Sequence, residues 1–490
     1  MLATNATTTP ARVHSGPAQP VDAGRFLSVE ALTRWQQALD DRGLRATGST
    51  AHADYIGDLA RRLSAVGVPD VALEAVPMRR WSARHWGLRL ESTDTAVAVV
   101  SPVAYSGRTD ADGVTGPLSS EPRAGSIGVV NVAPPAFTAG DFDALDYGSS
   151  APATTEPVYA PDQRYERVWL AHDFMRTELA RFKAAGAAGL IMVIDLPEEE
   201  LGGGYLLYDG VHRAIPALFV GRESGSLLRE AAFWGREATL TLVADVAQVD
   251  THNIVGIIPG ASDELVVLQS HTDGSNGLED NGCEAILAMA HHLAGLPRQE
   301  LPRSVLVLLS TGHFATAQAW GLEAFLERHR GDMVPRIAAA LCLEHLGALV
   351  SPPGHSDHVP GVTYEFGACF ATPHPAVVGS MRAALIRAQV TEPRVLRPFV
   401  PHPSGTSPDG TTWPGDGGPF WHTAGLPAAN FITGPGYLLN VEPVMDRIDV
   451  AALRRQAIAF TEAVLELAAV PWQELRGEAP RAPGSPCEGV

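Results

Sequence analysis

Residues 265–294 read LVVLQSHTDGSNGLEDNGCEAILAMAHHLA, and this stretch decides the fold. The apolar run Leu265–Leu268 predicts a short buried strand, and Gly282–Ala294 has the length and composition of a helix packed against it. The alternation continues on both sides, with apolar runs at Asn253–Ile258, Ser304–Leu309 and Ile337–Leu343 and a further helix at Trp320–Arg328. Strands and helices in alternation predict an α/β fold with a doubly wound, mostly parallel sheet covered on both faces.

Side chains that can bind metals follow three successive strands of this predicted sheet. They are His271 and Asp273 after the first, His313 after the second, and Glu344 with His345 after the third. Ligands of open α/β sheets bind beyond the carboxyl ends of the strands, so these side chains should share one region. A single histidine is more often structural, but three strand ends together favour a site.

His271, Asp280 and Glu344 supply one imidazole and two carboxylates, a set that suits one zinc ion with an open position for water. Such a water can ionise near neutral pH and act as a nucleophile. Asp273 is placed to accept the second N–H of His271 and so to fix its tautomer. Two plainer roles stay open, namely Asp273 as a turn residue and Asp280 as the N-cap of the helix at Gly282–Ala294.

The series His271-x-Asp273, Asp280-Asn281 and Glu344 resembles the zinc aminopeptidase and glutamate carboxypeptidase family. Most of the resemblance lies in residues 251–350, and further similar parts are Gly43–Ser49 and Phe420–Ile432. The resemblance implies a zinc-exopeptidase-like fold and puts His271, Asp280 and Glu344 on the ligands of one of the family's two metals. Asp280 then falls on the carboxylate that bridges both ions, and Glu344 stands for an aspartate.

Two departures from the family pattern remove the ligands of the second metal. The family's Glu-Glu pair, a general base followed by a ligand, falls on His313 and Phe314. Its late histidine falls near Tyr437–Leu439, where there is no imidazole. We therefore expect a single zinc ion, with Phe314 in the place of the second. His313 is then a general base, since its ordinary pKa is near 6.5, a fourth metal ligand, or a structural residue.

The chain divides into two predicted units. Residues 26–100 and 249–475 should form the zinc-peptidase-like α/β domain, interrupted at 101–248 by a β-rich insert that resembles a protease-associated domain. The best signs of that resemblance are Gly186–Ile191 and Ile215–Val220. Residues 1–25 are expected to be disordered, and residues 476–490 to form a flexible tail.

A segment rich in Pro, Gly and His, residues 350–420, should form loops around the site. The histidines of this segment and one just after it are candidates for lining a substrate pocket: His355, His358, His374, His402 and His422. Near the N-terminus, Arg45 follows the matched Gly43-Leu44 and is expected to be a salt-bridge residue.

Composition limits the partners of the protein. A net charge of −19 disfavours nucleic acid and anionic membranes as partners. The four cysteines form no Cys-x-x-Cys pair, so we expect them to be reduced and structural. No apolar run approaches about 18 residues, and the N-terminus lacks a secretory pattern, so we expect a cytoplasmic protein without a membrane span. The expected partner is a small-molecule or peptide substrate, and the oligomeric state is not predicted.

Three functions fit these observations. The first is a single-metal hydrolase that cleaves an amide, peptide or related acyl bond. The second is a non-catalytic scaffold or binding protein that has kept the fold. The third is an acyl-transfer or cyclising enzyme, because the resemblance extends to single-zinc glutaminyl cyclases, although those use the metal set that this chain has lost.

Overall fold

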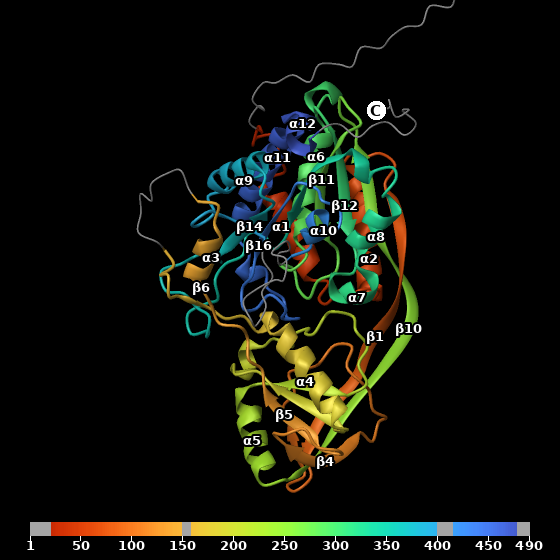
Figure 1. Ribbon diagram of the computed structural model, residues 1–490, viewed down its shortest axis with the longest axis vertical. Coiled ribbons are helices and arrows are strands. Elements are labelled where there is room, and N and C mark those ends of the chain that lie inside the picture. The colour runs from red at the N-terminus through yellow and green to blue at the C-terminus, as the bar shows by residue number, and fades with distance from the viewer. Residues whose placement is uncertain (1–20, 149–157, 399–414, 478–490) are drawn as a thin grey trace, which may run out of the picture.

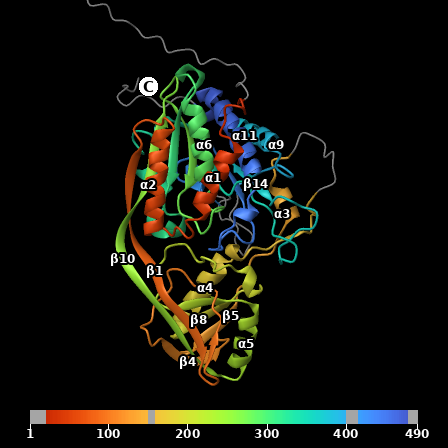
Figure 2. The same ribbon diagram turned by 180° about the vertical axis from the view of Figure 1, so that it is seen from behind.

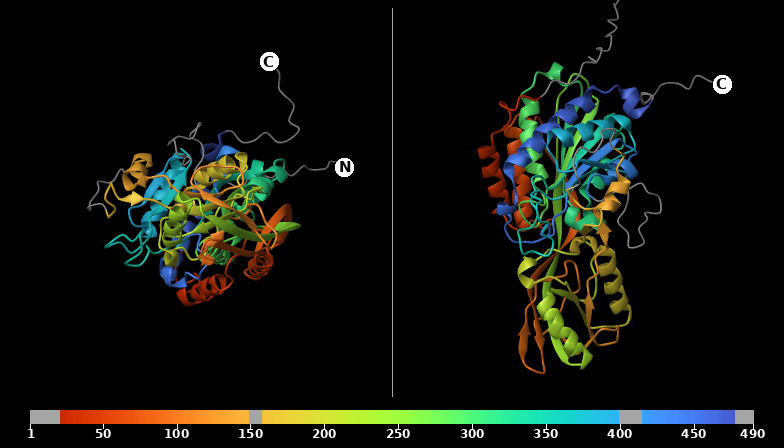
Figure 3. Two further views of the ribbon diagram at one scale, coloured as in Figure 1. Left: turned by 90° about the horizontal axis from the view of Figure 1, so that it is seen from below. Right: turned by 90° about the vertical axis from the view of Figure 1, so that its left-hand side faces the viewer.

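A computed structural model describes residues 21–148, 158–398 and 415–477, and all structural statements below concern these residues. The molecule has an upper α/β part and a smaller lower part, and two long strands run between them (Figure 1). Those strands are β1 (Ala72–Leu90) and β10 (Glu237–Ile258), which pair antiparallel from Ala72 opposite Val255 to Leu90 opposite Ala238. The lower part extends from the upper one as a separate lobe when the molecule is turned by 90° (Figure 3, right).

The centre of the upper part is a mostly parallel set of strands. The strand order is β15-β14-β16-β13-β11-β12-β10. Their bounds are β11 (Leu265–His271), β12 (Ser304–Ser310), β13 (Ile337–Leu343), β14 (Gly367–Ala371), β15 (Arg394–Leu396) and β16 (Ala428–Thr433). β11 is parallel to both β12 and β13, and every residue of these three strands is buried. The predicted doubly wound α/β fold is therefore confirmed.

Helices cover both faces of these strands. One face carries α1 (Val29–Asp40), α2 (Thr50–Ala65), α6 (Gly282–Ala294), α9 (Pro375–Arg387) and α11 (Val450–Ala469), as Figure 2 shows. The other carries α7 (Thr316–Ala319), α8 (Gly321–Arg328) and α10 (Gly418–His422). Remaining short elements are β2 (Thr95–Val97), β6 (Phe137–Thr138), β7 (Arg164–Tyr165), α3 (Ala139–Leu145) and α12 (Trp472–Arg476). Within the described ranges, no helix combines the length and apolarity that crossing a membrane requires.

The lower part contains most of the predicted insert together with β2 and the end of β1, whereas α3 of the insert lies against the upper part; the lower part is a small α/β layer. Its strands β4 (Val114–Ser119), β5 (Ile127–Asn131), β8 (Gly189–Val193) and β9 (Ala217–Val220) are parallel, and β3 (Ser101–Pro102) pairs antiparallel with β9. Helices α4 (His172–Ala184) and α5 (Arg222–Phe233) lie on opposite faces of these strands. Alternate residues of a strand point to opposite sides, so one set packs against α4 and the other against α5. The assignment of residues 101–248 to a protease-associated domain stays a prediction.

Several local expectations are wrong. The sequence pattern did not predict β1, and the predicted strand Asn253–Ile258 is only the end of the longer β10. Only alternate residues in part of β1 are buried, so pairing with β10 supports it more than burial does. Residues 350–420 hold β14, α9, β15 and α10 besides loops, and α9 starts with a proline at its first position, a favoured helix start. Val21, in the segment expected to be disordered, is buried and donates its N–H to Glu462; residues 1–20 and 478–490 lie outside the described ranges.

Candidate functional site

The carboxyl ends of β11, β12 and β13 bring the predicted side chains together. His271 is the last residue of β11, and its Nε2 lies 3.8 Å from Oε2 of Glu344, the residue after β13. The ring of His313, which follows β12, stacks on the ring of His271 with centroids 4.1 Å apart. The turn before His313 requires glycine, because a Cβ at Gly312 would lie 1.7 Å from the carbonyl oxygen of Ala319 and its φ is +89°.

One tautomer of His271 is fixed by the main chain. Its Nδ1 lies 2.9 Å from the carbonyl oxygen of Asp273, which can only accept, so Nδ1 carries a proton and, in the neutral ring, Nε2 has the lone pair. The predicted partner residue is therefore correct, but the contact is made by its backbone. The Asp273 carboxylate instead accepts hydrogen bonds from the Thr47 hydroxyl at 2.5 Å and the Phe314 amide at 2.8 Å. A catalytic role for Asp273 stays a prediction.

Asp280, the third predicted metal ligand, is paired with Arg45. Nη2 of Arg45 is 2.6 Å from one carboxylate oxygen and Nε is 2.8 Å from the other, and both side chains are fully buried. Burial opposes the charge of Arg45, but the Asp280 carboxylate holds the pKa of the guanidinium above its ordinary value. The N-cap of α6 is Asn281, so Asp280 does not take that plainer role. Asp280 as a metal ligand stays a prediction.

Glu279, which the sequence reasoning passed over, points into the site. Its Oε2 is 3.8 Å from Nδ1 of His271 and its Oε1 is 3.1 Å from Nε2 of His313. Burial raises the pKa of Glu279 above its usual range, although His271 and His313 oppose the shift. The signal that could have found it is the pair of adjacent carboxylates, Glu279 and Asp280, just before a helix.

His313 lies between two carboxylates. Its Nδ1 is 2.8 Å from Oδ1 of Asp416, and its Nε2 faces Glu279. The Asp416 carboxylate only accepts, so Nδ1 carries a proton, and the two carboxylates favour the charged imidazolium form, in which Nε2 carries one as well. Burial opposes this charge, but Asp416 and Glu279 hold the pKa of His313 well above its ordinary value. Such a ring has no lone pair for a metal or for a substrate proton.

Asp416 was also missed, because it stands alone in a segment rich in glycine and proline. Its main-chain N–H donates to Oε1 of Glu344 at 2.8 Å, so the same residue positions a predicted metal ligand. Burial would raise the pKa of its carboxyl group, but the neighbouring His313 lowers it below the usual range.

The resemblance places the missing ligands of a second metal at Phe314 and at the segment Tyr437–Leu439. The Phe314 ring is fully buried and packs against Tyr205 and Tyr208 of the insert, with centroids 4.9 and 5.2 Å away. In the late segment, the carbonyl oxygen of Leu438 accepts hydrogen bonds from Ser275 and Asn276. That Phe314 fills the place of a second metal stays a prediction.

The cluster as a whole suits a bound cation. Eighteen buried side-chain nitrogen and oxygen atoms of the described residues make no hydrogen bond, and six of them lie here: His271 Nε2, both Glu279 oxygens, Glu344 Oε2, His345 Nε2 and Asp416 Oδ2. Five carboxylates, those of Asp273, Glu279, Asp280, Glu344 and Asp416, outnumber the two cations Arg45 and His313. The carboxylates also raise the pKa of His271, although burial and His313 oppose this. Uncompensated buried carboxylates are costly, so this donor set fits a metal ion.

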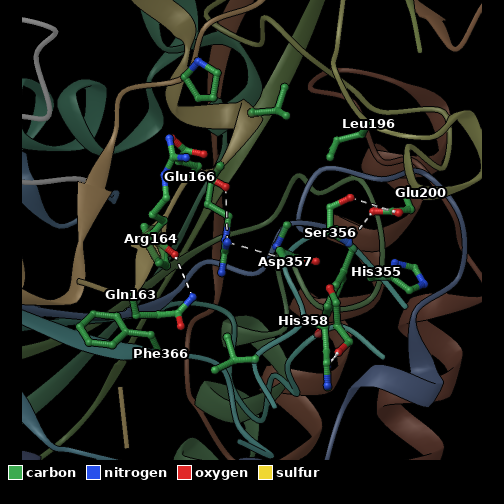
Figure 4. A pocket seen from close by; sticks show the side chains of 18 of the residues that line it. Gln163, Arg164, Glu166, Leu196, Glu200, His355, Ser356, Asp357, His358 and Phe366 are labelled. Carbon is green, nitrogen blue, oxygen red and sulfur yellow. Dashed lines mark hydrogen bonds and ion pairs between the residues drawn. The ribbon is translucent and has the colours of Figure 1, made fainter. Parts of the chain in front are cut away.

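A pocket of about 880 Å³ lies apart from the cluster, between the insert and the upper part (Figure 4). Glu200 of the insert bonds there to the main-chain N–H and hydroxyl of Ser356. His355 and His358 line this pocket, and no residue of the cluster does. Two other candidate histidines have partners elsewhere, since His374 bonds to the Glu474 carbonyl and His422, at the end of α10, lies beside Glu323; His402 lies outside the described residues. These histidines therefore do not surround the metal-binding cluster.

Known structures share this fold. The chain matches no protein-family model and no curated protein sequence. It is similar to BSAP, a zinc aminopeptidase from Bacillus subtilis, with a TM-score of 0.60 and 16% identity over 89% of this chain and 94% of that one. For the aminopeptidase from Aneurinibacillus sp. strain AM-1, the TM-score is 0.56 and the identity 15%, over 94% of this chain and 98% of that one. For the peptidase M28 precursor from Shewanella amazonensis SB2B, the TM-score is 0.57 and the identity 15%, over 90% of this chain and 97% of that one. The resemblance to zinc-aminopeptidase-like metallopeptidases is thus confirmed at the level of the fold.

Proposed function

We propose that the protein is a metal-dependent hydrolase, with one ion held at the carboxyl ends of β11 and β13, that cleaves an amide, peptide or related acyl bond. The observation that carries the proposal is the convergence of His271 Nε2 and Glu344 Oε2, two buried donor atoms 3.8 Å apart that make no hydrogen bond. Zinc is the ion favoured, because the solved structures with this fold include a zinc aminopeptidase.

A single ion suits the residues better than two. Arg45 is paired with Asp280, and His313 lies between Asp416 and Glu279, so part of the positive charge in this site comes from the protein itself. Phe314, buried among aromatic rings, offers no ligand atom. A second divalent ion would have to displace or repel these two protein cations.

The bound ion would polarise the scissile carbonyl and lower the pKa of a water molecule. Glu279 would then take the proton of that water, since burial raises its pKa towards the range that suits a general base at neutral pH. His313 would hold Oε1 of the base Glu279 in place, and Asp416 would in turn orient His313. The His313 side chain is 12% exposed, whereas those of His271, Glu279 and Glu344 are fully buried, so the substrate would approach over His313.

The test is metal content together with activity. The purified full chain, equilibrated with zinc and freed of excess, should contain about one equivalent by elemental analysis, and His271→Ala should contain none. The wild type should hydrolyse members of a panel of peptides, amides and esters, and a chelator should abolish this activity. N-terminal glutaminyl peptides belong in the panel, because their cyclisation would identify the acyl-transfer alternative.

A second candidate, a non-catalytic peptidase-like scaffold, is favoured by one specific observation. Three carboxylates of the cluster, those of Asp280, Asp416 and Glu279, face protein cations, and the cluster is almost closed to solvent. On this alternative the protein would retain no metal and would turn over no member of the panel. Absence of both would therefore replace the hydrolase proposal by the scaffold.

A further inference from the structure

We infer that His345 is the third protein ligand of the metal ion, with His271 and Glu344, and that Asp280 is not a ligand. The inference rests on the proposed single-metal site and names its ligand set. The ligand atoms of His271, Glu344 and His345 all lie within 4.8 Å of one another, and all three residues are buried. In the described part of the chain, neither of the two groups of three or more close metal donors includes Asp280.

An unusual backbone conformation lets two consecutive residues reach one point. Neighbouring side chains of an extended strand point to opposite sides, so Glu344 and His345 could not both face His271 if β13 simply continued. His345 instead has φ of +56°, in the left-handed region that only a few per cent of residues other than glycine adopt, histidine more often than most. Such a conformation costs roughly 1–2 kcal/mol and persists where its surroundings hold it, most often at functional sites.

Both imidazoles are held in the tautomer that a metal needs. Nδ1 of His345 is 2.6 Å from the carbonyl oxygen of Thr433, just as Nδ1 of His271 is 2.9 Å from that of Asp273. Each Nδ1 therefore donates its proton to the main chain, and in the neutral ring each Nε2 has a lone pair that can bind the ion. Neither Nε2 makes a hydrogen bond. A second hydrogen bond of this kind, which fixes tautomer and ring orientation, is the usual support of a metal-binding histidine.

Glu344 repeats the pattern with its two oxygens. Oε1 accepts hydrogen bonds from the main-chain N–H of Asp416 at 2.8 Å and from the thiol of Cys342 at 3.1 Å. Oε2 is buried, makes no hydrogen bond and lies on the side of His271. Each of the three residues thus has one polar atom anchored by the protein and one left free for the ion.

The competing donors are already engaged. In the other close group, His271 with Glu279 and His313, the Nδ1 of His313 is already bonded to Asp416 and its Nε2 lies 3.1 Å from Glu279. Both oxygens of Asp280 accept from Arg45, and binding a metal there would leave a buried guanidinium without its partner. Two imidazoles and one carboxylate, with a fourth position open, form a set that zinc occupies in hydrolases.

X-ray absorption spectroscopy of the zinc-loaded, full-length wild type tests the ligand set without any substitution. Two imidazoles per zinc are expected from the outer-shell scattering. One imidazole with two or more carboxylate ligands would overturn the inference while leaving the proposed hydrolase intact. Absence of stoichiometric zinc in the wild type would overturn both.

Matched variants test the ligand set independently. The quantity measured is their zinc affinity, determined by competition with a chromogenic chelator. In His345→Asn, the asparagine can adopt the left-handed conformation and can still donate to Thr433. This variant should lower the zinc affinity by more than about 100-fold, which exceeds the usual effect of losing a residue that only supports a ligand. Asp280→Asn, whose side-chain oxygen can still accept from Arg45, and His374→Asn, which lies elsewhere, should stay within about threefold. Loss of zinc in Asp280→Asn with retention in His345→Asn would reject the assignment.

Discussion

Arg45 and Asp280 form a two-point ion pair at the base of the site, with contacts of 2.6 and 2.8 Å, 235 residues apart in the sequence. The remaining donors of Arg45 are also used, since Nη2 donates to the Asn276 carbonyl at 2.6 Å and Nη1 contacts the Gly43 carbonyl. The pair therefore ties the N-terminal segment to the turn between β11 and α6. It also occupies the carboxylate that the family resemblance assigns to a bridging metal ligand.

Breaking this pair from one side should destabilise the protein strongly. Arg45→Met leaves the Asp280 carboxylate buried without a cation, which we expect to lower the free energy of unfolding by about 3–5 kcal/mol. Urea unfolding of the chelator-treated protein measures the change.

An exposed ion pair provides the control for Arg45. Arg89 and Asp94 are 48% and 80% exposed, so Arg89→Met should cost less than about 1 kcal/mol. The double variant Arg45→Met with Asp280→Leu, which removes both charges, should recover much of the loss. Equal effects of Arg45→Met and Arg89→Met would contradict the importance given to the buried pair.

Glu279→Gln should separate catalysis from metal binding. If Glu279 is the general base, kcat on the best substrate of the panel should fall by about 10²–10⁴-fold, with the zinc content unchanged. The measurement is steady-state kinetics beside elemental analysis on the same preparation.

His313→Gln provides a companion measurement for Glu279. Removing the imidazolium next to Glu279 should raise the pKa of its carboxyl group, because a positive charge favours the ionised form. The acidic limb of kcat/KM against pH should then move to higher pH. A pH profile that does not move, with kcat unchanged in Glu279→Gln, would assign proton transfer to another group.

His172 should make the metal-free protein less stable at acidic pH. Although the residue is partly exposed, its Nε2 is buried without a hydrogen bond, and burial, aided by Arg176, lowers the pKa of the ring to about 3. Below about pH 6.5 the unfolded chain binds a proton that the folded chain does not, so stability present above that pH is lost progressively towards pH 3. Between pH 7.5 and pH 5 the loss should reach up to about 2 kcal/mol.

The check on His172 is a comparison with a variant that cannot titrate. His172→Phe keeps an aromatic ring beside Tyr208, whose centroid lies 4.6 Å from that of His172. Urea unfolding at both pH values, with a chelator present, should show a smaller acid-induced loss in the variant than in the wild type. Identical pH dependence of the two proteins would mean that His172 titrates normally in the folded state.

Arg167 of the insert should stabilise the loop that supports His345. Its Nη2 is 2.9 Å from Glu365 in a buried pair, and its Nε donates at 2.8 Å to the carbonyl oxygen of Gly434, the residue after Thr433. Arg167→Gln leaves Glu365 buried without a cation, so we expect a loss of about 3–5 kcal/mol in urea unfolding. Arg164→Gln, which breaks a more exposed contact to Glu166, should cost less than about 1 kcal/mol, and equal losses would argue against this role.

The sequence by itself determined the elements whose signal is local. The apolar runs of β11, β12 and β13 and the helix α6 appear where the pattern predicts them, because fully buried parallel strands need uninterrupted apolar residues. The convergence of His271, His313 and Glu344 followed from the same pattern, since the carboxyl ends of adjacent parallel strands meet at one edge.

Only the tertiary structure decided which of the polar side chains are free to act. Asp280 is adjacent to Glu279 in the chain, yet one is held by Arg45 and the other faces His313. His345 has a left-handed backbone conformation that turns its side chain to the cluster. Asp416 belongs to a segment whose sequence gives no sign of a role in the site. Charge state, tautomer and the choice of ligand depend on partners that are distant in the chain, and a local pattern holds no information about them.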